Sequence, residues 1–201
     1  MPSQTPLAGV VLCGGRSLRM GVDKASIEVG GVTLLERALS RLRAACDPVL
    51  VAPGDVDLPA GAYVSVVDAM PGAGPLAGLV GALRAAPHRL LAVVAVDLPW
   101  LDPALFGLLA GRIGADDVAL CETERGVEPL HAVYARSALV AAEAALSGRD
   151  RSLRGLIDSL RTVRVTQPEW RAAGISARFS RNVNTPADLA ELSLELDRPA
   201  S

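Results

Sequence analysis

Short apolar runs alternate with amphipathic segments along most of this 201-residue chain. Apolar runs that end at glycine, proline or aspartate are typical of buried parallel strands. We expect such strands at residues 8–12, 48–52, 63–67, 90–96 and 117–121, and further strands at 27–29, 128–134 and 163–165. Helical spacing predicts helices at 33–45, 137–146 and 150–160, one that ends near 86, and others that begin near 102 and 185. The alternation indicates an α/β protein whose mainly parallel sheet has helices on both faces.

The run 90–96 is the most apolar in the chain, so we expect it to form a central strand. Asp97 follows it directly, and the carboxyl end of a central parallel strand borders the crevice where open α/β sheets bind ligands. The structural alternative is that Asp97 caps a turn. Asp102 and Pro103 already provide an N-cap and a first-turn proline for the next helix, which favours a functional role for Asp97.

Composition narrows the class of protein. The chain is long enough for one domain with a substantial core, which we place at residues 1–201 with frayed ends at 1–6 and 197–201. Half of the residues are hydrophobic but only 3% are aromatic, so the core should be aliphatic. The net charge of −2 gives no basic field for nucleic acid, and no apolar run approaches the roughly 20 residues of a membrane span.

The cysteines indicate a compartment. Cys13, Cys46 and Cys121 are odd in number and widely spaced, which is typical of reduced thiols rather than of a disulfide framework. The N-terminal residues carry no basic segment, so we expect no signal peptide. Both observations favour a cytoplasmic protein.

The most informative stretch follows the first strand and reads LCGGRSLRMGVDKA at residues 12–25. Gly14 and Gly15 allow a sharp turn that brings backbone N–H groups close to a ligand, and the basic residues after them suit a polyanion such as a triphosphate. Lys24 is the only lysine, whereas the other Lys/Arg positions are all arginine. A compact ammonium differs from a flat guanidinium, so this lysine suits a place between phosphate oxygens. The alternative is that a single lysine occurs here by chance.

The spacing matches neither of two common phosphate loops. A Walker loop has glycine directly before its lysine, but two residues separate Gly21 from Lys24, and residues 14–16 do not give the dinucleotide pattern G-x-G-x-x-G. The stretch closely resembles the signature of molybdenum cofactor guanylyltransferases, and its Gly-Gly and Asp-Lys pairs favour that branch over the cytidylyl one. The family usually has alanine where Cys13 stands. The resemblance implies a single-domain, three-layer αβα sandwich with a Rossmann-like sheet of the nucleotidyltransferase type.

Weaker motifs follow in the order expected for that family. They are Gly-Pro-Leu-Ala-Gly at 74–78, the aspartate after the central strand, Pro-Leu-x-Ala-x-Tyr at 129–134, and Asn-x-Asn-Thr-Pro at 182–186. Thr185, Pro186 and Asp188 make a helix start on their own. That reading leaves Asn182 and Asn184 without a structural role, although alternate positions of an extended segment face the same way.

The resemblance also implies roles for individual residues. Arg19, Lys24 and Asp97 are the catalytic candidates, with the two cations stabilising phosphate charge and Asp97 binding Mg²⁺ through a carboxylate oxygen. Asp23 is expected to orient Lys24. The nucleotide-binding candidates are Leu12, Cys13, Gly14, Gly15, Lys24, Asp68 and Asp97. The acceptor-side candidates are Gly78, Asn182 and Asn184.

The implied reaction is transfer of GMP from GTP to the terminal phosphate of molybdenum-loaded molybdopterin, which releases pyrophosphate. The implied cofactor is Mg²⁺, and the implied partners are GTP, a molybdopterin-type acceptor and transient contacts with molybdenum cofactor insertion and delivery proteins. Alternatives are a related nucleotidyltransferase that uses CTP or another phosphorylated acceptor, a non-catalytic GTP-binding protein that handles the cofactor, and, more distantly, an NADP-dependent reductase built on Gly72–Gly78.

Some positions leave the choice open. Ala52 and Pro53 stand where the family often has a base-facing asparagine, so the preference for GTP over CTP is undecided, and the oligomeric state is open as well. His131 is a candidate base or substrate contact, but a core or edge histidine is the more frequent outcome. Arg149, Arg151 and Arg154 are either an anion site or a solvated cluster at a helix end.

Overall fold

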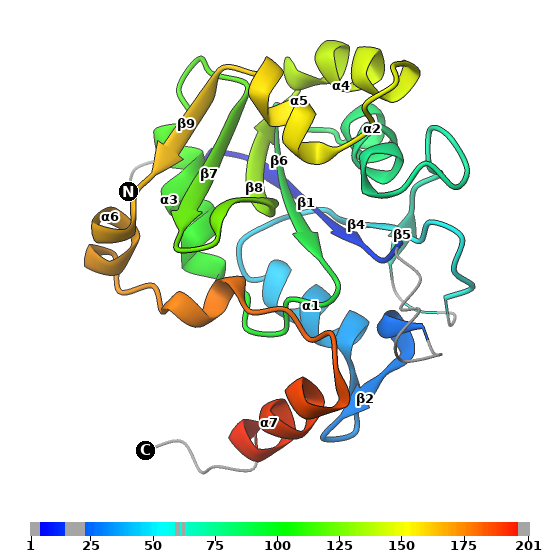
Figure 1. Cartoon of the computed structure of the whole chain (residues 1–201), viewed down its shortest axis with the longest axis vertical. Coiled ribbons are helices and arrows are strands. Elements are labelled where there is room, and N and C mark those ends of the chain that lie inside the picture. Colours follow the sequence, from blue (N-terminus) through cyan, green and yellow to red (C-terminus); the bar gives the residue numbers. More distant parts are fainter. Residues whose placement is uncertain (1–4, 15–22, 59–60, 62, 197–201) are drawn as a thin grey trace.

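A computed structural model describes residues 5–14, 23–58, 61 and 63–196 of the chain. Its centre is a seven-stranded sheet with the order β5-β4-β1-β6-β8-β7-β9, and a small hairpin pairs β2 (Glu28–Val29) with β3 (Val32–Thr33) (Figure 1). The strands of the large sheet are β1 (Leu7–Leu12), β4 (Val49–Ala52), β5 (Val64–Ser65), β6 (Leu90–Ala95), β7 (Val118–Thr123), β8 (Gly126–Ala135) and β9 (Thr162–Val165).

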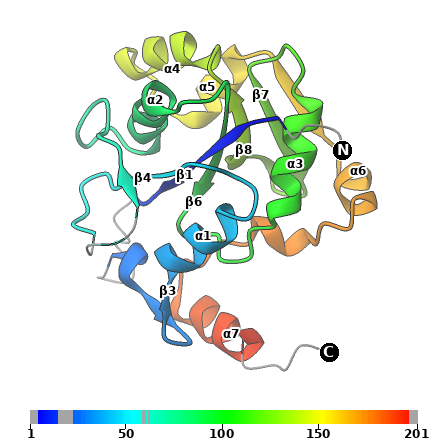
Figure 2. The same ribbon diagram turned by 180° about the vertical axis from the view of Figure 1, so that it is seen from behind.

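Helices cover both faces of the sheet, as Figures 1 and 2 show from opposite sides. The buried side chains of α1 (Leu34–Leu42), α3 (Pro103–Arg112) and α6 (Gln167–Ala172) pack in one core cluster. Those of α2 (Pro75–Ala85), α4 (Ala138–Ser147) and α5 (Leu153–Ser159) pack in the other. Side chains of neighbouring residues in a strand point to opposite faces of the sheet. In β1, Val11 therefore packs in the first cluster and Val10 packs in the second. The α/β, three-layer prediction is confirmed.

The last helix, α7 (Pro186–Leu196), lies beside the β2–β3 hairpin, away from the middle of the sheet in both views (Figures 1 and 2). Leu192 anchors it to the first core cluster. None of the described helices is long and apolar enough to cross a membrane.

Strand direction decides where a ligand can meet the sheet. The pairs β4–β5, β1–β4, β1–β6 and β7–β9 are parallel, whereas β8 runs antiparallel to β6 and β7. The carboxyl ends of β1, β4, β5, β6, β7 and β9 therefore share one edge, which is the edge where open α/β sheets bind ligands.

Some expectations about the elements are corrected. The run 63–67 is not a buried strand: β5 holds only two residues, and Val64 is 58% exposed, because this segment lies at the edge of the sheet. An apolar run by itself does not reveal whether a second layer covers it. The hairpin strand β3 and the helix α6 were not expected. Of the ends expected to be frayed, 1–6 and 197–201, residues 1–4 and 197–201 lie outside the described residues.

Candidate functional site

The side chains of Lys24, Asp97 and Asn184 meet at the carboxyl edge of the sheet. The ammonium of Lys24 donates to Asp97 Oδ2 and to Asn184 Oδ1, each at 2.6 Å. The Lys24 and Asp97 side chains are each only 14% exposed. Asp97 is 73 positions from Lys24 in the chain and Asn184 is 160 positions from it, yet the three side chains form one polar cluster.

Local structure places each member of this cluster. The carboxylate of Asp23 accepts from the Ala25 N–H at 3.1 Å and begins the short 3₁₀ helix η1 (Lys24–Ser26), so it positions Lys24 through the backbone. Asp97 follows the central strand β6 by two residues, and its carbonyl accepts from the Val183 N–H at 2.9 Å. That backbone bond brings Asn184, the next residue, against Lys24.

The cluster suits a hard cation. Carboxylate and amide oxygens are donors that Mg²⁺ accepts, and the Asp97 and Asn184 oxygens already converge on one positive charge. Asp97 Oδ1 is buried and has no hydrogen-bond partner in the described part of the chain. Within the same residues, no group of three or more His, Cys, Asp or Glu side chains could hold a metal ion. A divalent ion at Asp97 would therefore take most of its ligands from water and phosphate, which is the usual arrangement for Mg²⁺.

A cavity of about 340 Å³ lies on the β5 side of this cluster, at the ends of β1, β4 and β5 and at the start of α2. Its described lining consists of Gly14, Gly54, Asp55, Val56, Asp68, Gly72 and Gly74. Gly54 has a φ of +65°, and a Cβ built on it would lie 2.8 Å from Gly14 Cα. Glycine at this position thus lets two chain segments approach closely beside the cavity.

Asp68 turns its carboxylate toward the same cavity. Burial raises its pKa above the ordinary range, the nearby charge of Asp55 adds to the rise, and a hydrogen bond from the Gly54 N–H opposes it. Asp68 Oδ1 is buried and lacks a hydrogen-bond partner among the residues described. A hydroxyl of a ligand would satisfy such an oxygen.

Gly78 lies close to the floor of this region. A Cβ built on it would lie 3.2 Å from Ala52 Cβ, 3.3 Å from Leu12 Cδ2 and 3.4 Å from Asp68 Oδ1. Gly78 therefore lies on the side of this cavity, and its expected place near the acceptor stays a prediction. The Cys13 side chain packs in the core, where burial raises its pKa to about 12, so only its backbone is suited to contact a ligand.

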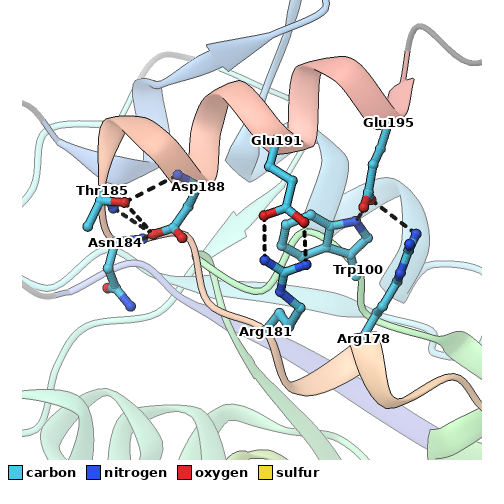
Figure 3. A network of polar contacts seen from close by, with 8 residues as sticks. All are labelled: Trp100, Arg178, Arg181, Asn184, Thr185, Asp188, Glu191 and Glu195. Atoms are coloured by element: carbon cyan, nitrogen blue, oxygen red, sulfur yellow. Dashed lines mark hydrogen bonds and ion pairs between the residues drawn. The ribbon is translucent and has the colours of Figure 1, made fainter.

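The segment before α7 carries the asparagines. Asp188 Oδ2 accepts from the Asn184 and Thr185 N–H groups, and the Asp188 N–H donates to Thr185 Oγ1, so the expected helix start is confirmed. Figure 3 shows this cap together with further contacts of α7, among them the ion pair of Arg178 with Glu195. Arg181 makes two hydrogen bonds to Glu191 and stacks over Trp100, and Glu195 accepts from Trp100.

Other candidates are placed away from the cluster or outside the described residues. His131 is fully buried among aromatic rings, so it is a core residue rather than an exposed base. Arg149, Arg151 and Arg154 are exposed. Gly15 and Arg19 lie outside the described residues.

Two features were missed by the sequence reasoning. Gly54 and Asp55 are not among the site residues expected from the sequence, although a glycine just after a parallel strand was the available signal. Glu128, at the start of β8, lies close enough to Asp97 for their charges to interact: burial raises the pKa of Glu128 and the Asp97 charge adds to the rise. No local sequence signal pairs these two carboxylates, because the sheet brings them together.

This chain is similar to known proteins in sequence and in fold. A family profile described as "MobA-like NTP transferase domain" matches residues 9–165. A relative from Opitutus terrae, named "Probable molybdenum cofactor guanylyltransferase", is 38% identical and the match covers 90% of this chain and 92% of the relative. A relative of the same name from Deinococcus radiodurans is 39% identical, with 94% of each chain covered.

A solved structure shares the fold. The crystal structure of molybdopterin-guanine dinucleotide biosynthesis protein A from Archaeoglobus fulgidus superposes with a TM-score of 0.81 at 24% identity, and the match covers 94% of this chain and 98% of that one. The fold and the comparisons together define an enzyme class, the nucleotidyltransferases. Within that class, the chain belongs to the MobA-like NTP transferase domain family. Nucleotidyltransferases generally use a divalent metal ion.

Proposed function

We propose that this protein transfers GMP from GTP to the terminal phosphate of molybdopterin that carries molybdenum, which gives molybdopterin guanine dinucleotide and pyrophosphate. The observation that carries the proposal is the meeting of Lys24, Asp97 and Asn184 in a chain 38–39% identical to proteins named as probable molybdenum cofactor guanylyltransferases. The aspartate, the lysine and the asparagine belong to three separate motifs that resemble that family's signatures.

In the proposed reaction, a phosphate oxygen of the acceptor forms a bond to the α-phosphorus of GTP. The bond from that phosphorus to the oxygen bridging to the β-phosphate breaks, and pyrophosphate leaves with the electron pair. The attacking phosphate is already ionised at neutral pH, so no general base is needed. Both substrates are polyanions, and the main tasks of the protein are positioning and charge neutralisation.

The roles divide along the carboxyl edge of the sheet. Backbone N–H groups at Gly14 cradle the triphosphate, and Asp68 accepts from a ribose hydroxyl in the adjacent cavity. The ammonium of Lys24 neutralises phosphate charge together with Arg19. Mg²⁺ bound at Asp97 would polarise the α-phosphate. Asn182 and Asn184 orient the phosphate of the acceptor.

Turnover of single variants tests the proposal. We expect Asp97→Ala and Lys24→Ala each to lower turnover about 10²-fold, as expected for lost electrostatic stabilisation. The matched control is Asp102→Ala, which removes an aspartate that only caps α3 and accepts from the Ala104 N–H. The assay incubates the protein with GTP, Mg²⁺ and molybdenum-loaded molybdopterin, and mass spectrometry detects the dinucleotide.

The same assay separates the alternatives. Preference for CTP over GTP in pyrophosphate release would replace the guanylyl assignment with a cytidylyl one. GTP binding without release of pyrophosphate with any acceptor would favour a non-catalytic cofactor-handling protein. Near-normal turnover of Asp97→Ala would remove that residue from the mechanism.

A further inference from the structure

His131 is a buried polar residue that the proposed reaction does not use. It lies on β8 opposite Val94 of β6, and its side chain is fully buried between the rings of Phe106 and Phe179. Its Nδ1 lies 3.1 Å from the carbonyl oxygen of Phe179. A carbonyl only accepts, so the proton of the neutral ring resides on Nδ1.

The partner of that bond belongs to the segment that leads to Asn184. Phe179 is only 1% exposed. Its ring packs edge-to-face with the ring of Trp170, and the two ring centroids are 5.3 Å apart. Four residues later, the Val183 N–H donates to the Asp97 carbonyl. The segment 179–184, which we call the acceptor strap, is thus fixed to β8 at one end and to the end of β6 at the other.

The chemistry of His131 favours a specific tie over ordinary core packing. An aliphatic side chain would fill this apolar site without the cost of a buried acceptor, yet Nε2 is buried and has no hydrogen-bond partner among the described residues. Burial lowers the pKa of His131 to about 4, so the ring stays neutral and keeps its single donor at physiological pH. Within the described part of the chain, the one hydrogen bond that compensates for burying this imidazole is the bond to the strap.

We propose that His131 is a positioning residue that fixes the acceptor strap, and through it Asn182 and Asn184, against Asp97 and Lys24. The kinetic consequence rests on the proposed function, because it assumes that the strap orients the acceptor. The nucleotide cavity lies at the ends of β1, β4 and β5, so binding of GTP depends little on this tie.

Three substitutions at this position separate the tie from packing. The amide of His131→Asn can place a donor where Nδ1 lies, the amide of His131→Gln reaches instead toward the position of Nε2, and His131→Leu has no donor. The matched control is Tyr134→Phe, which removes a partly buried side-chain bond of the same strand, from Tyr134 Oη to the Pro129 carbonyl at 2.9 Å.

Hydrogen exchange of the strap amides is the first readout, because it does not depend on activity. We expect exchange at Val183 to accelerate about tenfold in the Leu and Gln variants, the factor that one net hydrogen bond contributes, and to stay near the parent value in the Asn variant and in Tyr134→Phe. Unchanged exchange in the Leu variant, or equal acceleration in Tyr134→Phe, would overturn the proposal. Nitrogen NMR of the parent protein gives an independent check, since a ring protonated on Nε2 would also overturn it.

Kinetics is the second readout. We expect the KM for the acceptor to rise about tenfold in the Leu and Gln variants while the KM for GTP stays within about twofold, with rescue by Asn. A parallel rise of both KM values would indicate general loss of structure and would overturn the positioning role. A parent protein that makes no dinucleotide would refute the proposed function instead, and the exchange result would still decide whether His131 fixes the strap.

Discussion

Replacing Lys24 by methionine should strengthen the binding of a divalent cation to the protein without nucleotide. The Lys24 ammonium donates at 2.6 Å to Asp97 Oδ2 and at 2.6 Å to Asn184 Oδ1, which are two of the oxygens best suited to hold a metal ion. A cation that binds Asp97 must displace this ammonium or tolerate its charge nearby. Methionine keeps the length of the side chain and removes the charge.

The contacts set the size of the effect. A hydrogen bond to a charged group contributes about 1.5–3 kcal/mol net, and the pair is mostly buried, at 14% exposure for each side chain. Because 1.4 kcal/mol is about a factor of ten in an equilibrium constant, the ion pair should lower cation affinity about ten- to a hundredfold. Lys24→Met should recover that factor.

Mn²⁺ is a suitable probe, because free and bound ions are distinguished by electron paramagnetic resonance. The control Arg84→Met changes the net charge equally but breaks an exposed pair with Glu143, so Mn²⁺ affinity should not change. Asp97→Asn should abolish the binding. With a non-hydrolysable GTP analogue, the parent should gain more affinity for Mn²⁺ than Lys24→Met does, because the phosphates draw the ammonium away from Asp97.

Equal or weaker Mn²⁺ binding by Lys24→Met would refute the reasoning. It would mean either that the ion binds elsewhere or that the ammonium helps to shape its site. Tighter binding by Arg84→Met as well would show a general effect of net charge rather than competition at Asp97.

Two further predictions concern stability. Gly54→Ala places a Cβ 2.8 Å from Gly14 Cα at a φ of +65°, so it should cost about 1–3 kcal/mol of unfolding free energy in urea titrations and weaken GTP binding; parent-like values for both would contradict the close approach. The unfolded state protonates His131 near pH 6.5 whereas the folded state does so near 4, so the unfolded state binds more protons between these values and stability must fall as the pH drops through them. Between pH 7 and pH 4.5 this residue should account for a loss of about 2.4 kcal/mol that is absent in His131→Asn, as measured by urea unfolding at the two pH values.

Local patterns were sufficient for most elements. The helix start at Thr33, the Asp102–Pro103 start of α3 and the cap at Thr185 appear in the structure as expected, because each depends on residues within one helical turn. The central position of residues 90–96 in the sheet could be predicted because the run is uniformly apolar, whereas a strand with one solvent-exposed face alternates apolar and polar residues. For Lys24 and Asp97, the sequence predicted only that both lie at the same edge of the sheet, because neighbouring parallel strands end at the same edge. It did not predict their ion pair.

Contacts between distant segments depended on tertiary structure. The sequence did not distinguish the edge strand β5 from a buried one, because an apolar run looks the same in either place. The sequence also did not reveal that Glu128 lies near Asp97 or that the ammonium of Lys24 donates to Asn184. Nor did it reveal the hydrogen bonds that hold the acceptor strap at His131 and at Asp97. The sequence by itself determined which residues carry charge and where most of the helices and strands lie. Only the packed sheet decided which of those charges meet, because such contacts depend on strand order and register over more than 150 residues.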